Sequence, residues 1–393
     1  MIDVYLVSGV RTAIGKRGGA LAKSRADELL ATVLAEAVRR AGIDPARVDD
    51  VIGGTVTQIG EQGFVLPRMA ALVAGFPAEV SGVSVNRQCG SSLTAINLAA
   101  GLIGSGQRDV IVATGCELMS KYAIGADWFG LTMNNGEAAG MPFGPKYLER
   151  VGALADQGQA AQMIATKWGI SKSECDEFAY RSHQRAAAAT AAGHFTDEIL
   201  PIEVDDGAGG TRTHALDETI RADTTMEKLA GLKTVFGTEM ITAGNSSPIS
   251  DGASAVVLAS GAVVKELGLK PLARFVMSAV TGADPLLMLT GPIRATDLAL
   301  KRAGLKLADI DVVEINEAFS PVPLAWGREH HPDWEKVNPN GGAIALGHPV
   351  GNSGCRLTIT AMHHLKRTGG RYGMITLCTG GGMAPATIIE NVA

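Results

Sequence analysis

Two stretches of this chain, RRAGIDPARVDDVI at residues 39–52 and KRAGLKLADIDVVEI at residues 301–315, decide its fold. Their first residues lie 262 positions apart (301 − 39), and GSGQRDVIVATG and RTGGRYGMITLCTG repeat at nearly the same offset. A chance match between Ala- and Gly-rich segments is the alternative explanation. The repeat predicts two copies of one α/β unit.

Short apolar runs alternate with helical patterns around both stretches. In the first copy we expect strands at 4–8, 51–56, 82–85 and 110–114 and helices at 28–41, 64–74 and 91–103. In the second copy we expect strands at 312–315 and 372–377, with helical segments at 299–303, from about 318 and after 349. Strands that alternate with helices predict parallel sheets.

The segment between the copies has a different texture. It holds a Gly-, Met- and Asn-rich stretch, a helical pattern and polar turns, at residues 130–144, 159–192 and 205–210. Long insertions in α/β enzymes often line substrate sites. We therefore predict an N-terminal half, an inserted loop domain and a C-terminal half, at residues 1–118 with 251–268, 119–250 and 269–393.

Composition excludes several classes of protein. The net charge of −5 gives no electrostatic footprint for nucleic acid, and no apolar run approaches the roughly 18 residues that a membrane span needs. The first residues, MIDVYLVSGVRT, resemble a strand more than a signal peptide. Five cysteines without a C-x-x-C pair predict neither a disulfide framework nor structural zinc, and they fit the reducing cytoplasm.

The first candidate site is the turn VNRQCGSS, which places Cys89 just before a helix. A lone buried cysteine is most often a small hydrophobic residue. A helix N-terminus lowers the pKa of a thiol, but the dipole supplies only about 0.3–1 kcal/mol, so a nucleophile here needs a base. We expect His348, in the Gly-lined stretch GGAIALGHPVGNSG, to stay neutral and to serve as that base. If the repeat is real, the two turns lie at comparable places, and both helix N-termini converge at a pseudo-twofold centre.

Two further turns supply polar groups. Cys378 ends an apolar strand, and the glycines that follow it, including Gly380, can aim N–H groups at an oxyanion. In INEAFS, Asn316 can hold a water or donate to a carbonyl, and Glu317 can brace the turn. The alternatives are a tight turn after a core cysteine and a plain asparagine turn. The other seven histidines are interpreted as structural or surface residues, and we predict no metal site.

These motifs together identify a family. VNRQCGSS, NEAF, GGAIALGHPVGNSG and CTGGG, with RTAIGK and TAGNSSPISDGASA, resemble the thiolases (acetyl-CoA C-acyltransferases) over essentially the whole chain. The resemblance implies two mixed five-stranded halves in α-β-α-β-α layers and a loop domain that covers coenzyme A. It implies an enzyme with no covalently bound cofactor and with coenzyme A as a substrate.

The resemblance also assigns roles to residues. Cys89 is expected to take the acyl group as a thioester, His348 to activate it, and Cys378 to move the α-carbon proton of the second substrate. The two expected oxyanion sites are Asn316 (through a water) with His348, and the N–H groups of Cys89 and Gly380. For coenzyme A, the resemblance implies Ser247, Ala318 and Phe319 along the pantetheine arm and Arg221 at the nucleotide phosphates.

Departures from the family pattern bear on the substrate. CGSS occurs on the degradative side, and residues 155–158 read Ala-Asp-Gln-Gly where biosynthetic members carry a His before Met-Gly. TQIGEQ and REHHPDWEKVNPNGG resemble actinobacterial thiolases of steroid catabolism. We therefore expect cleavage of a 3-ketoacyl-CoA to acyl-CoA and acetyl-CoA or propionyl-CoA, in fatty acid or steroid degradation.

Rival functions remain at this stage. A biosynthetic acetoacetyl-CoA thiolase shares these motifs, whereas a β-ketoacyl synthase has a second His or an Asn where this chain has Cys378. A non-catalytic acyl-CoA-binding or scaffold subunit has no need for three reactive turns. The resemblance further implies a homo-oligomer, a dimer of dimers, with β-oxidation enzymes as candidate partners.

Overall fold

The strands of both copies line up in the same spatial order. The structure, a computed structural model, describes residues 2–393. Its first sheet has the strand order β4-β3-β5-β9-β1. Taken in that order, the strands span Ser81–Val85, Asp50–Gly54, Val110–Leu118, Ser250–Ser260 and Val4–Thr12. The second is ordered β11-β12-β13-β10, with bounds Val312–Ile315, Tyr372–Thr376, Met383–Asn391 and Ala273–Gly282. Two residue pairs of β1 and β10, Tyr5 with Arg274 and Leu6 with Ala273, join the halves into one continuous sheet. Short strands β2 (Gly15–Lys16) and β6 (Ile199–Leu200) add to β9 and β1.

Equivalent elements begin or end 262 residues apart. The helices of the two copies are α1 (Ala26–Ala41), α2 (Leu66–Val73), α3 (Ser91–Gly104), α9 (Gly291–Ala303), α10 (Pro321–His330) and α12 (Ser353–Thr368). The spacing holds for the starts of β3 and β11, of α3 and α12, and of β5 and β12, and for the ends of α1 and α9. The internal repeat is therefore real and not a chance match.

Two expectations about the sheets need correction. The sheets are mixed, as the resemblance implies, and not parallel, as the alternation of strands and helices predicts, because β9 and β13 run antiparallel to their neighbours. The second half also has four strands and not five: the fifth position is a single bridge from Val313 to Val337. Asn338 turns into a left-handed backbone (φ 45) and Pro339 has no N–H to donate, so pairing stops there.

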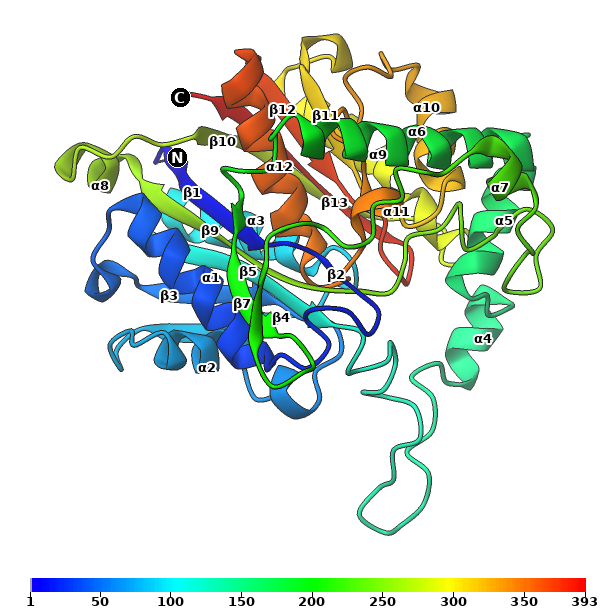
Figure 1. Cartoon of the computed structure of the whole chain (residues 1–393), viewed down its shortest axis with the longest axis horizontal. Coiled ribbons are helices and arrows are strands. Elements are labelled where there is room, and N and C mark those ends of the chain that lie inside the picture. The colour runs from blue at the N-terminus through cyan, green and yellow to red at the C-terminus, as the bar shows by residue number, and fades with distance from the viewer. Residues whose placement is uncertain (1) are drawn as a thin grey trace.

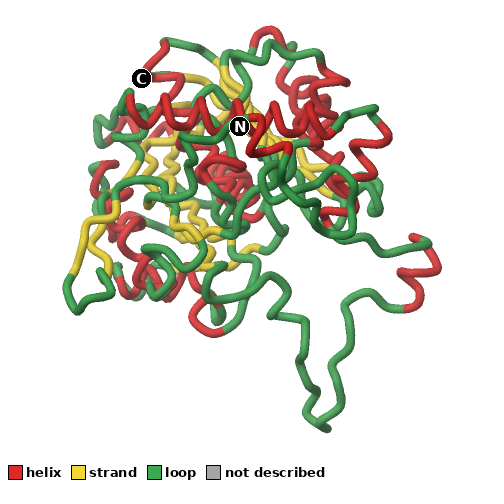
Figure 2. Tube along the Cα trace, turned by 45° about the vertical axis from the view of Figure 1, so that its right-hand side comes forward, coloured by secondary structure: helices red, strands yellow, loops and turns green. Residues whose placement is uncertain are grey.

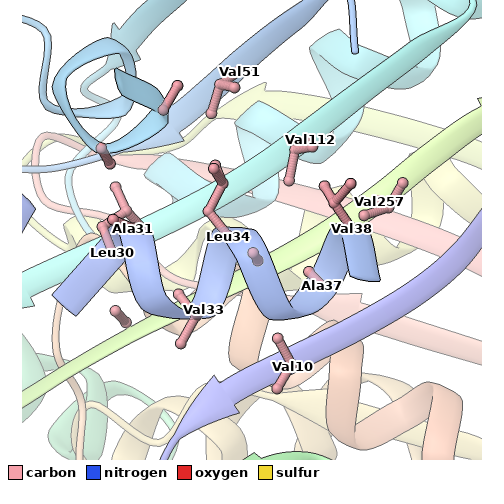
Figure 3. Close-up of a cluster of buried hydrophobic side chains, with 14 of the residues drawn as sticks. Val10, Leu30, Ala31, Val33, Leu34, Ala37, Val38, Val51, Val112 and Val257 are labelled. Carbon is pink, nitrogen blue, oxygen red and sulfur yellow. The ribbon is translucent and has the colours of Figure 1, made fainter. Parts of the chain in front are cut away.

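Three separate apolar cores define five layers, helix-sheet-helix-sheet-helix. Figure 3 shows Leu34 and Val38 of α1 beside Val51, Val112 and Val257 on the outer face of the first sheet. The next residues along those strands point to the opposite face, which packs on α3 and α12. A third core lies between the second sheet, α9 and α10. The alternation follows from the period of two along a strand.

Helices α3 and α12 pack against each other and form the central layer (Figure 1). The backbone N–H of Cys355 donates to Ser92 Oγ over 3.0 Å. A Cβ on Gly354 would lie 2.1 Å from the nitrogen of Leu93, so only glycine permits this approach. The expected convergence of the two helix N-termini is confirmed.

The segment between β5 and β9 leaves the layers. It contains α4, α5, α6, α7 and the separate hairpin β7-β8, with bounds Pro145–Val151, Gln157–Lys167, Lys172–Ala191, Met226–Ala230, Ile202–Asp205 and Thr211–His214. Before α4 the chain makes a long excursion away from the body of the molecule, visible in Figures 1 and 2. Complete capping boxes at Asp156 and Ser171 start α5 and α6.

The last elements are two short helices, α8 (Gly261–Glu266) and α11 (Ala343–Leu346). Helix α10 begins at Pro321, three residues after the expected start, because residues 316–320 form the turn that carries Asn316. Along residues 2–393 no helix is both long and apolar enough to span a membrane.

Candidate active site

The turn that carries Cys89 joins β4 to α3 and is strained. Gln88 has a left-handed backbone (φ 47), which is uncommon for a residue other than glycine. Ser91 Oγ stabilises the turn by donating to the carbonyl of Gln88 over 2.6 Å and accepting the N–H of Arg87 over 2.9 Å. The turn delivers the Cys89 sulfur into a small apolar cluster with Val56 and Val350.

Burial controls the ionisation of this thiol. Burial raises the pKa of Cys89 to about 11, although the N–H groups of Cys89 and Gly380 and the side-chain amide of Gln157 act in the opposite direction. Burial therefore outweighs the small lowering of this pKa that a helix start is expected to supply, and a base is needed to form the thiolate. The dipole and the donors are too weak to offset desolvation.

Cys378 lies in the turn after β12, directly against the Cys89 turn. A Cβ on Gly90 would lie 2.7 Å from Thr379 Cγ2, so the two turns are in close contact. Burial, followed by the neighbouring charge of Cys89, raises the pKa of Cys378 well above its usual range, while the Asn316 amide donates toward its sulfur. The structure thus brings both sulfurs and Asn316 together.

The hydrogen bonds of His348 fix its neutral tautomer. Ser353 Oγ donates its one proton to the carbonyl of Pro349 over 3.0 Å, so it can only accept from His348 Nδ1, 2.6 Å away. Nε2 then carries the lone pair and accepts from Asn316 Nδ2 over 3.2 Å. The basic nitrogen of the ring therefore faces Asn316, whose amide also donates toward the Cys378 sulfur.

Burial, with a smaller contribution from the charge of Arg356, lowers the pKa of His348 to about 3. The expectation of a neutral imidazole is confirmed. The resting pair is accordingly a thiol and an imidazole, and not an ion pair. Asn316 Oδ1 is buried and has no hydrogen-bond partner among the described residues, so one acceptor remains free beside the sulfurs.

Glu317 braces the loop that leads to His348. Its carboxylate accepts from Ser182 Oγ and Asn338 Nδ2 at 2.7 Å and from the N–H of Ile344 at 3.2 Å. A Cβ on Gly342 would lie 2.1 Å from Glu317 Cδ, which explains the glycine there. Burial raises the pKa of Glu317, and the three donors oppose that shift.

The three neutral residues expected along a pantetheine arm lie side by side. The N–H of Ser247 donates to the carbonyl of Ala318 over 3.0 Å, and Phe319 pairs with Ser246 in an isolated bridge. Arg221 is different, because it is exposed and its backbone N–H donates to His183 Nδ1 over 3.2 Å. Among residues 2–393, none of the hydrogen bonds or ion pairs of Arg221 reaches the sulfur cluster.

Sequence reasoning missed three contributors. Ser353 orients His348. The repeat could have indicated this residue, since Ser353 lies 262 positions after Ser91, the serine that stabilises the Cys89 turn. Glu117, fully buried, accepts from the N–H groups of Val56 and Gly351 at 2.9 and 3.0 Å and so ties the loops on both sides of Cys89. The third, Gln157, was noted only as a departure from a family pattern.

Such a cluster can attack, stabilise an oxyanion and exchange a proton. One thiol lies beside two N–H donors, and a second thiol lies beside an amide that also contacts a neutral imidazole. In the part of the chain that the structure describes, no group of three or more His, Cys, Asp or Glu side chains is placed to hold a metal ion.

Comparison with known proteins agrees with this chemistry. The family model "Thiolase, N-terminal domain" matches residues 4–262, and "Thiolase, C-terminal domain" matches residues 269–391. Steroid 3-ketoacyl-CoA thiolase FadA6 of Mycobacterium tuberculosis is 46% identical, and the match covers 100% of this chain and 95% of that protein. A beta-ketoadipyl-CoA thiolase of Acinetobacter baylyi is 42% identical with full coverage of both chains.

Solved structures agree as well. The crystal structure of human mitochondrial 3-ketoacyl-CoA thiolase superposes with a TM-score of 0.88 at 39% identity, covering 100% of this chain and 99% of that one. Two domain families that follow each other along nearly all of the chain, full-length relatives and a shared fold give one answer. The chain belongs to the thiolase family and is an acyltransferase of that family.

Proposed function

We propose that this thiolase cleaves a 3-ketoacyl-CoA with coenzyme A, yielding acetyl-CoA or propionyl-CoA and a shortened acyl-CoA, during fatty acid or steroid degradation. The observation that carries the proposal is the meeting of Cys89, Cys378 and the Asn316–His348 pair at one place. The experiment that tests it is mass spectrometry after incubation with a 3-ketoacyl-CoA. An acyl adduct on the Cys89 peptide supports the proposal, and an unmodified Cys89 in active protein would overturn it.

The reaction balances with these groups. Cys89 gives its proton to His348 and its sulfur attacks the C3 ketone, and the C2–C3 bond then breaks with its electron pair left on C2. Cys378 donates a proton to C2, which releases acetyl-CoA, or propionyl-CoA from a 2-methyl substrate. Cys378, now a thiolate, takes the proton of the incoming coenzyme A, whose sulfur displaces Cys89 from the acyl group. The released Cys89 sulfur recovers its proton from His348, which restores the resting thiol and the neutral imidazole.

Two sets of donors fit the two charges that develop. The N–H groups of Cys89 and Gly380 already face the Cys89 sulfur, where the C3 oxyanion forms. Asn316, through a water, and His348 would stabilise the enolate oxygen of the second substrate, which must lie near Cys378. One set of donors therefore lies beside the Cys89 sulfur, and the other lies beside the Cys378 sulfur.

Coenzyme A is proposed to enter over the inserted segment. The adjacent positions of Ser247, Ala318 and Phe319 support a pantetheine channel beside α10. The exposed Arg221 is left as the proposed contact for the nucleotide phosphates. We propose the same division of the chain as before, with residues 119–250 as the covering domain and residues 1–118 with 251–268 and 269–393 as the two halves.

The names of the relatives differ in the acyl group of the substrate. A relative at 46% identity acts, by its name, on steroid-derived 3-ketoacyl-CoA, and others at 41% identity are acetyl-CoA acetyltransferases. We propose a bulky or branched acyl group. Thiolysis rates of a steroid-derived, a long linear and a short 3-ketoacyl-CoA should fall in that order, and strong preference for acetoacetyl-CoA would favour the biosynthetic alternative.

A homo-oligomer is proposed from the free edge of the first sheet. β4 is the last strand of the sheet, and near it Phe64 is 85% exposed in a strained left-handed backbone (φ 47). Val73 and Leu98 add exposed apolar area on the adjoining helices. We propose that a second copy covers this edge and that the long excursion before α4 joins dimers into a tetramer, which light scattering of the intact protein would test.

The tautomer of His348 gives one prediction. Ser353→Ala should lower kcat/KM for thiolysis about tenfold, because the ring loses the acceptor that keeps its lone pair on Nε2. The measurement is steady-state kinetics with nitrogen NMR of the ring tautomer. Ser353→Thr should restore both readouts, and the exposed Ser105→Ala should change neither; a wild-type rate in Ser353→Ala would refute the orienting role.

The resting thiol gives a second prediction. Alkylation of Cys89 by iodoacetamide should rise about tenfold per pH unit from pH 7 to 10, since only the thiolate reacts and burial raises the pKa to about 11. No inflection should occur near pH 6.5, because the pKa of His348 is lowered to about 3 and the ring stays neutral. A midpoint below pH 8, followed on the Cys89 peptide, would contradict this picture.

A further inference from the structure

Gln157 is the first residue of α5, and it reaches the nucleophile from the inserted segment rather than from either repeated half. Its side-chain amide donates toward the sulfur of Cys89. Its Nε2 atom lies 3.2 Å from the position that a Cβ would take on Gly380. The amide therefore lies beside the two N–H groups that already face this sulfur.

The position of Gln157 is held by packing on both sides. Ala160, Ala161 and Ile164 of α5 share a buried cluster with Cys378 and Phe319. These contacts fix α5 against the turn that carries Cys378, so the Gln157 amide is held in place before a substrate binds.

A second contact links Gln157 to the proposed pantetheine channel. A Cβ on Gly158 would lie 2.3 Å from the ring of Phe236, so glycine is needed for this ring to pack over the start of α5. The ring of Phe236 meets that of Phe319 edge-on, with centroids 6.0 Å apart. Phe319 of this aromatic pair thus belongs to the proposed pantetheine channel, and Phe236 contacts Gly158, the residue after Gln157.

We infer that Gln157 is a positioning residue whose amide stabilises the Cys89 thiolate, so that activation of the nucleophile depends on the inserted segment. The inference rests on the proposed function, in which Cys89 is the nucleophile. The other titratable groups that act on the sulfur are Glu117 from β5 and Cys378 after β12; His348, before α12, contacts the Asn316 amide beside Cys378. Glu117 and Cys378 oppose the thiolate when charged, which leaves the neutral amide as the side-chain donor that favours it.

The test compares two substitutions that change the donor in different ways. Gln157→Met removes the N–H groups at similar length, and Gln157→Glu keeps the shape but places a negative charge beside the sulfur. Alkylation of Cys89 by iodoacetamide, followed by peptide mass spectrometry from pH 7 to 10, should be about tenfold slower in Gln157→Met, which corresponds to about one pH unit. It should be slower still in Gln157→Glu, and kcat/KM for thiolysis should fall in the same order.

The order of the two variants separates the electrostatic role from a steric one. If Gln157 only fills space, the isosteric Gln157→Glu should stay closer to the wild type than Gln157→Met, and that order would overturn the inference. The exposed Gln107→Met is the matched control and should match the wild type in both measurements. An acyl adduct on wild-type Cys89 with unchanged alkylation in both variants would refute this inference alone, whereas absence of the adduct would refute the proposed function.

Discussion

Replacing Cys89 by alanine is expected to lower the rate of 3-ketoacyl-CoA thiolysis by at least about 10⁴-fold and to abolish the acyl adduct on the protein. The proposed mechanism passes through a thioester on this sulfur, which the substitution removes. Cys378 is the nearest other thiol, but it is fully buried and its pKa is raised even further. Steady-state rates with mass spectrometry of the acylated protein measure both effects.

A matched control exists in the first copy. Cys116 occupies the place in β5 that Cys378 occupies after β12, 262 residues later; it lies in the apolar core under α1, and its sulfur donates toward the carbonyl of Ala26 at 3.8 Å. The Cys116→Ala variant should therefore keep the wild-type rate of 3-ketoacyl-CoA thiolysis. If Cys89→Ala retained more than about 1% of the activity, the covalent mechanism would have to be abandoned.

Replacing Arg11 by methionine is expected to lower the free energy of unfolding by about 3–5 kcal/mol. Arg11 is buried in β1, with Nε 2.7 Å from Glu198 Oε1 and Nη1 2.7 Å from Asp217 Oδ1. Both carboxylates are also buried, so removal of the guanidinium leaves two negative charges without their partner in a region of low dielectric constant. Urea unfolding at fixed protein concentration measures the loss.

The partners provide the check on this explanation. Adding Glu198→Gln and Asp217→Asn to Arg11→Met should recover part of the lost stability, because the unpaired charges are then gone. Arg47→Met breaks an exposed pair with Glu266 and should cost less than about 1 kcal/mol. If Arg11→Met cost no more than Arg47→Met, the buried triad would not be what holds the loops of the inserted segment onto β1.

Much of the fold was predictable, because the repeat and the alternation of strands and helices can be read directly from the sequence. The pair of stretches at 39–52 and 301–315 gave the two copies, and the helix expected at 91–103 differs from α3 by one residue. The direction of β9 and β13 was not predictable, since antiparallel pairing depends on which strand the chain returns to. The missing fifth strand depends on the backbone angle at Asn338, which the letters alone do not give.

For the site, residue types were more predictable than their electrostatics. Turn patterns indicated Cys89, His348 and Cys378, and the structure brings all three to one place. The raised pKa of Cys89 was not predicted, because the effect of a helix start can be estimated from sequence, whereas desolvation depends on residues distant in sequence that cover the sulfur. Gln157 was missed for the same reason, because its approach to Cys89 comes from tertiary packing alone.

The groups of the proposed mechanism are divided between the two copies: the proposed nucleophile follows β4, and the proposed base and the second thiol belong to elements that come after β10. In the first copy Gly54 stands where the second has Asn316, and in the second copy Gly351 stands where the first has Cys89. A symmetric scaffold thus holds an asymmetric set of reagents. Neither half, produced as a separate polypeptide, would contain a complete catalyst, and mixing the two fragments would restore turnover only where their central helices dock again.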